Sequence, residues 1–132
     1  MDGERPTEKE LAERIAQFWL PDEPVLYIGL TTRPLRRRVA EYYKTPLGAR
    51  KPHAGGHFLK TLETLDRLFV HSAGCAEPHT AEDAMLNAFC AGVSAGARQR
   101  LADPERPFPF ANLEWPRGTR KKHGLTGTKE AR

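Results

Sequence analysis

The sequence predicts a small α/β domain in which helices cover two or three strands. Two short apolar runs, 25–30 and 68–73, are rich in strand-favouring residues, and turn-forming residues bound the first of them. Apolar side chains recur at helical spacing in 8–19, 34–43 and 81–92. A sheet of so few strands is stable only if helices cover at least one of its faces, and this sequence supplies those helices.

The first expected element is an amphipathic helix over 8–19. Thr7 and Glu10 form a capping box, in which each side chain accepts a hydrogen bond from the backbone amide of the other residue. Pro21 marks the end of this helix because proline cannot continue the hydrogen-bond ladder.

The strand 25–30 leads directly into the second helix, 34–43, which begins with a proline after two threonines. The residues 44–56 then form a long polar loop, and loops of this length in compact domains are more often functional than accidental. A short helix is expected over 58–65, before the second strand.

The last third of the chain predicts a helix and an irregular end. Thr80 is the expected cap of the helix 81–92, and 94–101 either continue this helix or form a separate turn. The segment 108–115 is irregular or strand-like. We expect one domain over 1–118 and a basic, flexible tail over 119–132, which contains few apolar residues.

Composition excludes several classes of protein. The chain has 132 residues and a formal net charge of +4, and none of its apolar runs approaches the roughly 20 residues that cross a bilayer. Its start resembles no signal peptide. The only two cysteines, Cys75 and Cys90, form no CxxC motif, which argues against a cysteine zinc site and a disulfide scaffold. A reducing cytoplasm is the expected compartment, without a membrane partner.

Basic residues are concentrated in the middle of the chain. Between Arg33 and Lys60 there are eight of them against one acid, Glu41. Such concentrated positive charge suits a polyanion such as nucleic acid, although a solvated, arginine-rich helix face explains it equally well. The candidate DNA-binding residues are Arg33, Arg36, Arg37, Lys44, Arg50, Lys51 and Lys60.

One part of the sequence contains residues that could act on a phosphate. The strand ends in Tyr27-Ile28-Gly29, and the following helix opens with Leu35-Arg36-Arg37-Arg38-Val39. A strand, loop and helix of this size can bring the Tyr27 phenol and the Arg38 guanidinium to one surface. Guanidinium suits phosphate because its planar fork donates two parallel, charge-assisted hydrogen bonds.

These residues resemble the motifs of the GIY-YIG nuclease family, together with a Glu that opens a later apolar helix and a late Asn. The resemblance spans about 25–112. It implies a two- to three-stranded, mostly antiparallel sheet flanked by helices, and an endonuclease that cuts DNA phosphodiesters at one divalent metal ion, Mg²⁺ or Mn²⁺.

The resemblance assigns roles residue by residue. Tyr27 lies near the attacking water, Arg38 steadies the charged phosphorus, and Tyr42 contacts the scissile phosphate or its leaving group. Glu82 is the metal ligand, and Asn112 orients the phosphate or a neighbouring side chain.

An active-site histidine is also implied, and both His53 and His57 lie where some members of the family place it. For Tyr27, whose ordinary pKa is about 10, Arg38 and the metal must lower the pKa if it is to act as a base.

The chain departs from the family in its first motif, because no Gly-x-Tyr precedes Tyr27. We expect 7–20 to be a helical insertion or leader and the chain to begin after the first strand, with further domains outside it. A weaker alternative makes 17–20 the missing strand, with Trp19 in place of the tyrosine.

Two other functions compete with the nuclease. The domain is alternatively a non-catalytic DNA-binding module derived from such a nuclease, which keeps the basic surface of 33–60 and 117–122 and cleaves nothing. A third possibility is an interaction domain whose arginines pair with an acidic protein, and this version has no affinity for DNA.

Overall fold

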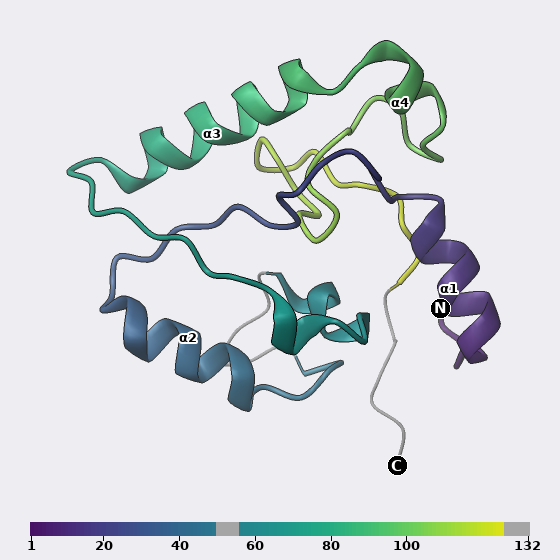
Figure 1. The fold of residues 1–132 in the computed structure, drawn as a ribbon. Coiled ribbons are helices and arrows are strands. Elements are labelled where there is room, and N and C mark those ends of the chain that lie inside the picture. Colours follow the sequence, from purple (N-terminus) through teal and green to yellow (C-terminus); the bar gives the residue numbers. More distant parts are fainter. Residues whose placement is uncertain (50–55, 126–132) are drawn as a thin grey trace.

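The fold is seen in a computed structural model that describes residues 1–49 and 56–125. The helices in chain order are α1 (Glu8–Ala16), α2 (Leu35–Lys44), η1 (His57–Thr61), η2 (Leu65–Arg67), α3 (Pro78–Gly92) and α4 (Ala95–Gln99). α3 runs along one side of the molecule, α2 lies on the opposite side, and α1 closes a third side (Figure 1). The closing segment, defined here as residues 107–125, threads between them.

No β-sheet forms in the described residues, so the predicted α/β fold with a mostly antiparallel sheet is wrong. The segment 25–30 is extended but belongs to no strand ladder. The one β-type pairing within 1–49 and 56–125 is an isolated antiparallel bridge between Glu114 and Arg120. The molecule is therefore a set of helices packed around irregular, extended chain.

The contacts of 25–30 show why no ladder forms there. The amide of Ala111 donates to the Leu26 carbonyl at 2.9 Å, as a partner strand would. The next pairing is made by a side chain, because Asn112 accepts from the Ile28 amide at 2.9 Å and donates to the Ile28 carbonyl at 2.8 Å. Two nearby prolines of the closing segment have no amide hydrogen for a ladder. A side-chain amide thus replaces the second strand.

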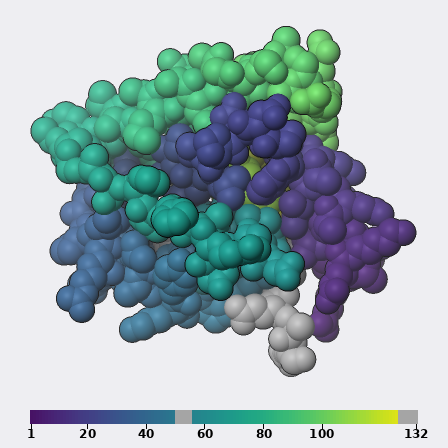
Figure 2. Space-filling view, in the orientation of Figure 1, coloured from purple at the N-terminus to yellow at the C-terminus, as the bar shows by residue number. Residues whose placement is uncertain are grey.

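The other predicted strand, 68–73, is extended chain at the surface. In the part of the chain that the structure describes, residues 69–76 make no backbone hydrogen bond. Phe69 is 88% exposed and Val70 is 63% exposed, so most of the surface of these β-favouring residues faces solvent. The same stretch, in teal, crosses the front surface of the molecule (Figure 2).

The predicted helices form, with shifted ends. The capping box of Thr7 and Glu10 is complete, and α1 ends earlier than expected, at Ala16. α2 lies one residue from its expected position. α3 starts before Thr80, because Pro78 occupies the first turn, where a missing amide hydrogen costs nothing.

Two of the expected segments are broken into shorter pieces. The predicted helix over 58–65 is two 3-10 helices, η1 and η2. Ser94 separates α4 from α3, since its hydroxyl accepts the Ala97 amide at 3.2 Å and caps a new helix.

Two hydrophobic clusters hold these elements together. The larger consists of Phe18, Phe58, Phe110, Ala111 and Leu125, and the α1 side chains Leu11 and Ile15 pack against it. The smaller joins Leu20 to Val93 and Leu101 and so attaches α3 and α4. Phe18 of the larger cluster and Leu20 of the smaller both lie just after α1, so this short segment connects the two halves of the core.

Residues 119–125, which we expected in a flexible tail, are part of the packed structure. Lys121, His123 and Leu125 are buried, and Leu125 belongs to the larger cluster. The rest of the expected tail lies outside the described residues. The packed unit therefore extends at least to Leu125, beyond the expected boundary at 118.

Lys121 is a charged group inside this packing. Its ammonium donates to the carbonyls of Pro109 and Phe110 at 3.1 and 3.2 Å. Burial lowers its pKa from 10.5 to about 8, although Asp103 and Cys90 act in the opposite direction. The ammonium thus connects the end of the closing segment to its middle, and its loss of water on burial opposes this contact.

We expect Asn112→Ala to lower the free energy of unfolding by roughly 2–4 kcal/mol, because it leaves the buried amide and carbonyl of Ile28 without partners. Chemical denaturation measures this. Asn87→Ala, on the exposed side of α3, is the matched control and should change stability by less than about 0.5 kcal/mol. Equal effects of both substitutions would contradict the role assigned to Asn112.

A second prediction concerns alkaline pH. The folded state holds the Lys121 proton less tightly than the unfolded chain, so the unfolded state binds more protons between the two pKa values and stability rises with pH. From pH 8 to 9.5 this contributes roughly 1.5 kcal/mol. Denaturation midpoints of wild type and Lys121→Met, compared from pH 8 to 9.5, measure this contribution. If the ammonium is solvated, the stability of wild type should not rise relative to that of the variant.

Candidate functional site

A hollow of about 320 Å³ lies between α3 and the closing segment, and it contains three of the predicted site residues. Tyr27 enters it from the extended segment, Glu82 from α3 and Asn112 from the closing segment. The full lining is Tyr27, Gly56, Glu82, Leu86, Ala111, Asn112, Leu113, Glu114, Trp115 and Arg120. Residues from four separate parts of the sequence thus meet at one site.

Tyr27 lies in a slot formed by two glycines. A Cβ atom at Gly29 would stand 2.5 Å from the Tyr27 hydroxyl oxygen, and one at Gly56 would stand 3.2 Å from the ring. Gly56 also has a φ of +66°, a conformation that other residues rarely adopt. Both glycines are therefore required for the ring to lie where it does.

The pKa of Tyr27 is raised, in contrast to the lowered pKa that a general base needs. Burial is the largest cause, the Glu82 carboxylate adds to it, and Arg38 opposes both. Tyr27 therefore keeps its proton at neutral pH and is available as a hydrogen-bond donor. The opposite signs of Glu82 and Arg38 also show that both groups lie near the phenol.

Glu82 lies in the second turn of α3 and is partly buried. Burial, followed by Asp83, raises the pKa of Glu82, while His79 and the backbone of Leu30 lower it. A cation bound at this carboxylate would remove the unfavourable charge.

The donor set of the hollow fits a hard divalent ion. Its two acidic side chains, Glu82 and Glu114, supply oxygen ligands, and Mg²⁺ commonly takes only one or two carboxylates and keeps several waters. Within 1–49 and 56–125, no group of three or more His, Cys, Asp or Glu side chains surrounds a common point. Glu82 and Glu114 could thus hold a magnesium ion that keeps most of its waters.

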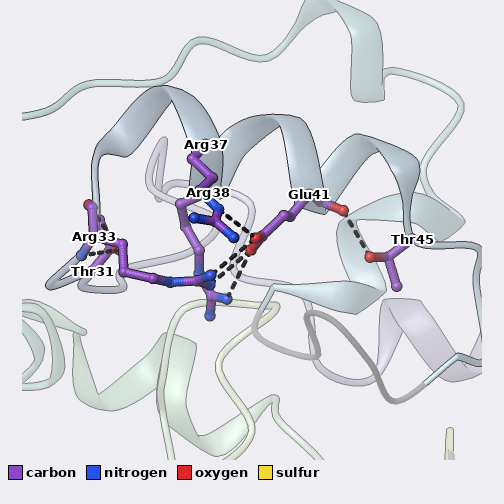
Figure 3. A network of polar contacts seen from close by, with 6 residues as sticks. All are labelled: Thr31, Arg33, Arg37, Arg38, Glu41 and Thr45. Carbon is purple, nitrogen blue, oxygen red and sulfur yellow. Dashed lines mark hydrogen bonds and ion pairs between the residues drawn. The ribbon is translucent and has the colours of Figure 1, made fainter.

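Arg38 lies beside the hollow and does not line it. It belongs to a cluster on α2 in which three arginines surround the carboxylate of Glu41 (Figure 3). Arg33 holds both oxygens, at 2.7 and 2.9 Å, whereas Arg38 approaches to 3.9 Å. Arg38 is therefore the most weakly held of the three, and it is the one that acts on the pKa of Tyr27.

Tyr42 lies one turn beyond Arg38 and reaches the same glycine as Tyr27. Its hydroxyl donates to the Gly56 carbonyl at 3.1 Å. Burial raises the pKa of Tyr42, and Tyr43 and Tyr27 add to the effect. Tyr42 supports the slot behind Tyr27 and is not part of the lining.

His57 and Asn112 make structural contacts. The Nε2 atom of the buried His57 accepts the Gly48 amide at 2.7 Å, and the side chain is not part of the hollow's lining. Asn112 lines the hollow, but both ends of its amide are engaged with Ile28. Its role here is to hold the wall of the hollow in place.

The basic residues divide into structural and exposed ones. Lys60 donates to the carbonyls of Tyr42 and Thr45 at the end of α2, where a cation is favourable to the helix dipole. Arg36 and Lys44 are exposed on α2. Three predicted residues, Arg50, Lys51 and His53, lie outside the described residues.

Sequence reasoning identified Asn112 of the closing segment but missed two other residues of the same segment. Trp115 and Arg120 line the hollow, and neither is among the predicted site residues. The available signal was the tryptophan directly before the basic run 117–122. A basic stretch with an aromatic residue is typical of nucleic-acid binding.

No family model, curated protein or solved structure matches this chain. In the described part of the chain, every helix is too short or too polar to cross a membrane.

The Glu41 cluster leads to a test of the basic surface. Glu41→Gln removes the carboxylate that three arginines share, so we expect the variant to elute from immobilised heparin at higher salt than wild type. The matched control is Glu13→Gln, which makes the same change of charge on α1. If the two variants elute together, the arginines of α2 form no anion-binding surface.

Proposed function

We propose that this chain is a metal-dependent endonuclease of the GIY-YIG type that hydrolyses phosphodiester bonds in DNA. The observation that carries this proposal is the meeting of Tyr27 and Glu82 in one hollow, with Arg38 near enough to act on the phenol. A phenol, a carboxylate and a guanidinium around a space for one phosphate are the groups that the resemblance requires. The missing sheet leaves this local arrangement in place.

Glu82 is the residue that would hold the ion, with Glu114 as the second carboxylate of the hollow. A bound Mg²⁺ or Mn²⁺ supplies Lewis acidity and neutralises charge on a phosphate oxygen. Glu82 and Tyr27 line the same hollow, so an ion held by this carboxylate would lie beside the phenol.

Arg38 and Tyr27 act on the phosphate itself. The Arg38 guanidinium donates to the non-bridging oxygens, where negative charge develops as water attacks phosphorus and the P–O bond to the leaving group breaks. Arg38 is held by Glu41 only at 3.9 Å, so it can turn to a phosphate at little cost. Tyr27, which stays protonated, donates a hydrogen bond and orients the phosphate or the attacking water.

A non-catalytic DNA-binding module is the second candidate, and the state of Tyr27 favours it. A buried phenol whose pKa is raised is a poor general base. In this version the basic side chains of α2 bind the phosphate backbone, and no bond is broken. The two candidates differ in a single measurable property, which is cleavage.

The test is nicking of supercoiled plasmid DNA in the presence of Mg²⁺ or Mn²⁺. We expect wild type to nick the plasmid and Arg38→Ala and Glu82→Ala to lose at least ~100-fold of the rate, because each substitution removes a charge that acts on the phosphate. EDTA should abolish the activity of wild type.

The controls exclude contamination and general charge effects. Arg67→Ala and Asp66→Asn make comparable charge changes at exposed positions on η2 and should nick like wild type. Equal rates for wild type, Arg38→Ala and Glu82→Ala would overturn the catalytic proposal. Plasmid binding that weakens steeply with salt, without nicking, would select the DNA-binding module.

A further inference from the structure

The wall of the hollow that the closing segment contributes is a rigid hairpin. The Trp115 amide donates to the Thr119 carbonyl at 3.1 Å, and the isolated bridge joins Glu114 to Arg120. The Gly118 amide donates to the Glu114 carboxylate at 2.7 Å and closes the turn. These contacts hold two side chains, those of Trp115 and Arg120, at the edge of the hollow.

The Trp115 ring is fixed from two sides. Its Nε1 atom donates to the Asp83 carboxylate at 2.9 Å, which ties the hairpin to α3 next to Glu82. Its ring also packs edge-on against Phe108, with the centroids 6.1 Å apart. Only part of the ring is buried, and it lines the hollow. A partly open, preoriented indole offers a flat surface for stacking at little entropic cost.

Arg120 is exposed and lines the same hollow. Several other arginines are held by carboxylates, such as Arg33 by Glu41 and Arg106 by Asp103. In the described residues no acidic group lies within ion-pair distance of the Arg120 guanidinium. Its planar fork is therefore free to bind an anion, and phosphate matches that geometry.

We propose that the hairpin 113–120 forms a subsite for one unpaired nucleotide, in which Trp115 stacks on the base and Arg120 binds the phosphate. The inference rests on the proposed function, since it names the form of nucleic acid that the same hollow accepts. A hollow of about 320 Å³ is at the small end of ligand sites and suits a single nucleotide rather than a stretch of duplex. The substrate is then a single strand, or a site where one nucleotide is unpaired.

The test uses the fluorescence of Trp115. The chain has two tryptophans, so Trp19→Phe leaves Trp115 as the only one, and its emission is followed with excitation that tyrosine does not absorb. Trp19 packs on Phe110 and is not part of the hollow's lining. Titration of this protein with a short oligothymidylate in EDTA should quench the emission, because the base stacks on the indole. A duplex of the same length should quench it much less.

Substitutions at Arg120 test the phosphate contact separately from the stacking of the base on Trp115. In the Trp19→Phe background, we expect Arg120→Ala to weaken oligothymidylate binding roughly ten-fold and to reduce the salt dependence by about one released ion. Arg120→Lys should lie in between, because it keeps the charge and loses the fork. The matched control is Arg117→Ala, an exposed arginine of the same hairpin outside the lining, which should bind like its parent.

The outcomes distinguish this inference from the proposed function. Quenching that depends on Arg120, without plasmid nicking, supports the subsite and overturns hydrolysis. Nicking that requires Arg38 and Glu82, without any change in Trp115 emission on titration, supports hydrolysis and overturns the subsite. Equal affinities of Arg120→Ala and Arg117→Ala, both with wild-type melting temperatures, also overturn the subsite. If Arg120→Ala melts early, Arg120→Lys decides in its place.

Discussion

The double hydrogen bond between the Asn112 side chain and the backbone of Ile28 is the constraint on which the site depends. It fixes the closing segment against the extended segment at a point where neither is part of a sheet. Tyr27 precedes this contact in the chain, and the hairpin with Trp115 follows Asn112 closely. A single buried amide thus sets the distance between two walls of the hollow.

One carboxylate restrains three arginines of the basic region. Glu41 is the partner of Arg33, just before α2, and of Arg37 and Arg38 in α2, while Lys60 donates to carbonyls at the end of the same helix. The positive charge that this region offers to a polyanion is therefore smaller than its formal charge. Two arginines stand out by their relation to the site. Arg38 approaches Glu41 only to 3.9 Å and acts on the pKa of Tyr27, and Arg120 lines the hollow.

The sequence allowed the helices and part of the site to be predicted, because both depend on local signals. The capping box located α1, and the short spacing between Tyr27 and Arg38 predicted that they lie near one another, whereas Glu82 came only from the family resemblance. The sheet was predicted wrongly, since strand propensity does not reveal whether a partner strand exists. The raised pKa of Tyr27 and the structural use of Lys60 depend on burial and distant contacts that no spacing encodes.

The bare, extended stretch 69–76 joins the two parts of the chain that build the hollow. Its backbone makes no hydrogen bonds within the described residues and its apolar side chains are open to solvent, so it is the most accessible point for a protease. A cut there would place Tyr27 and Arg38 on one polypeptide and Glu82, Trp115 and Arg120 on the other. Phe18 would lie on the first fragment and Phe110 and Leu125 on the second, so packing in the larger cluster alone would hold the two walls of the hollow together.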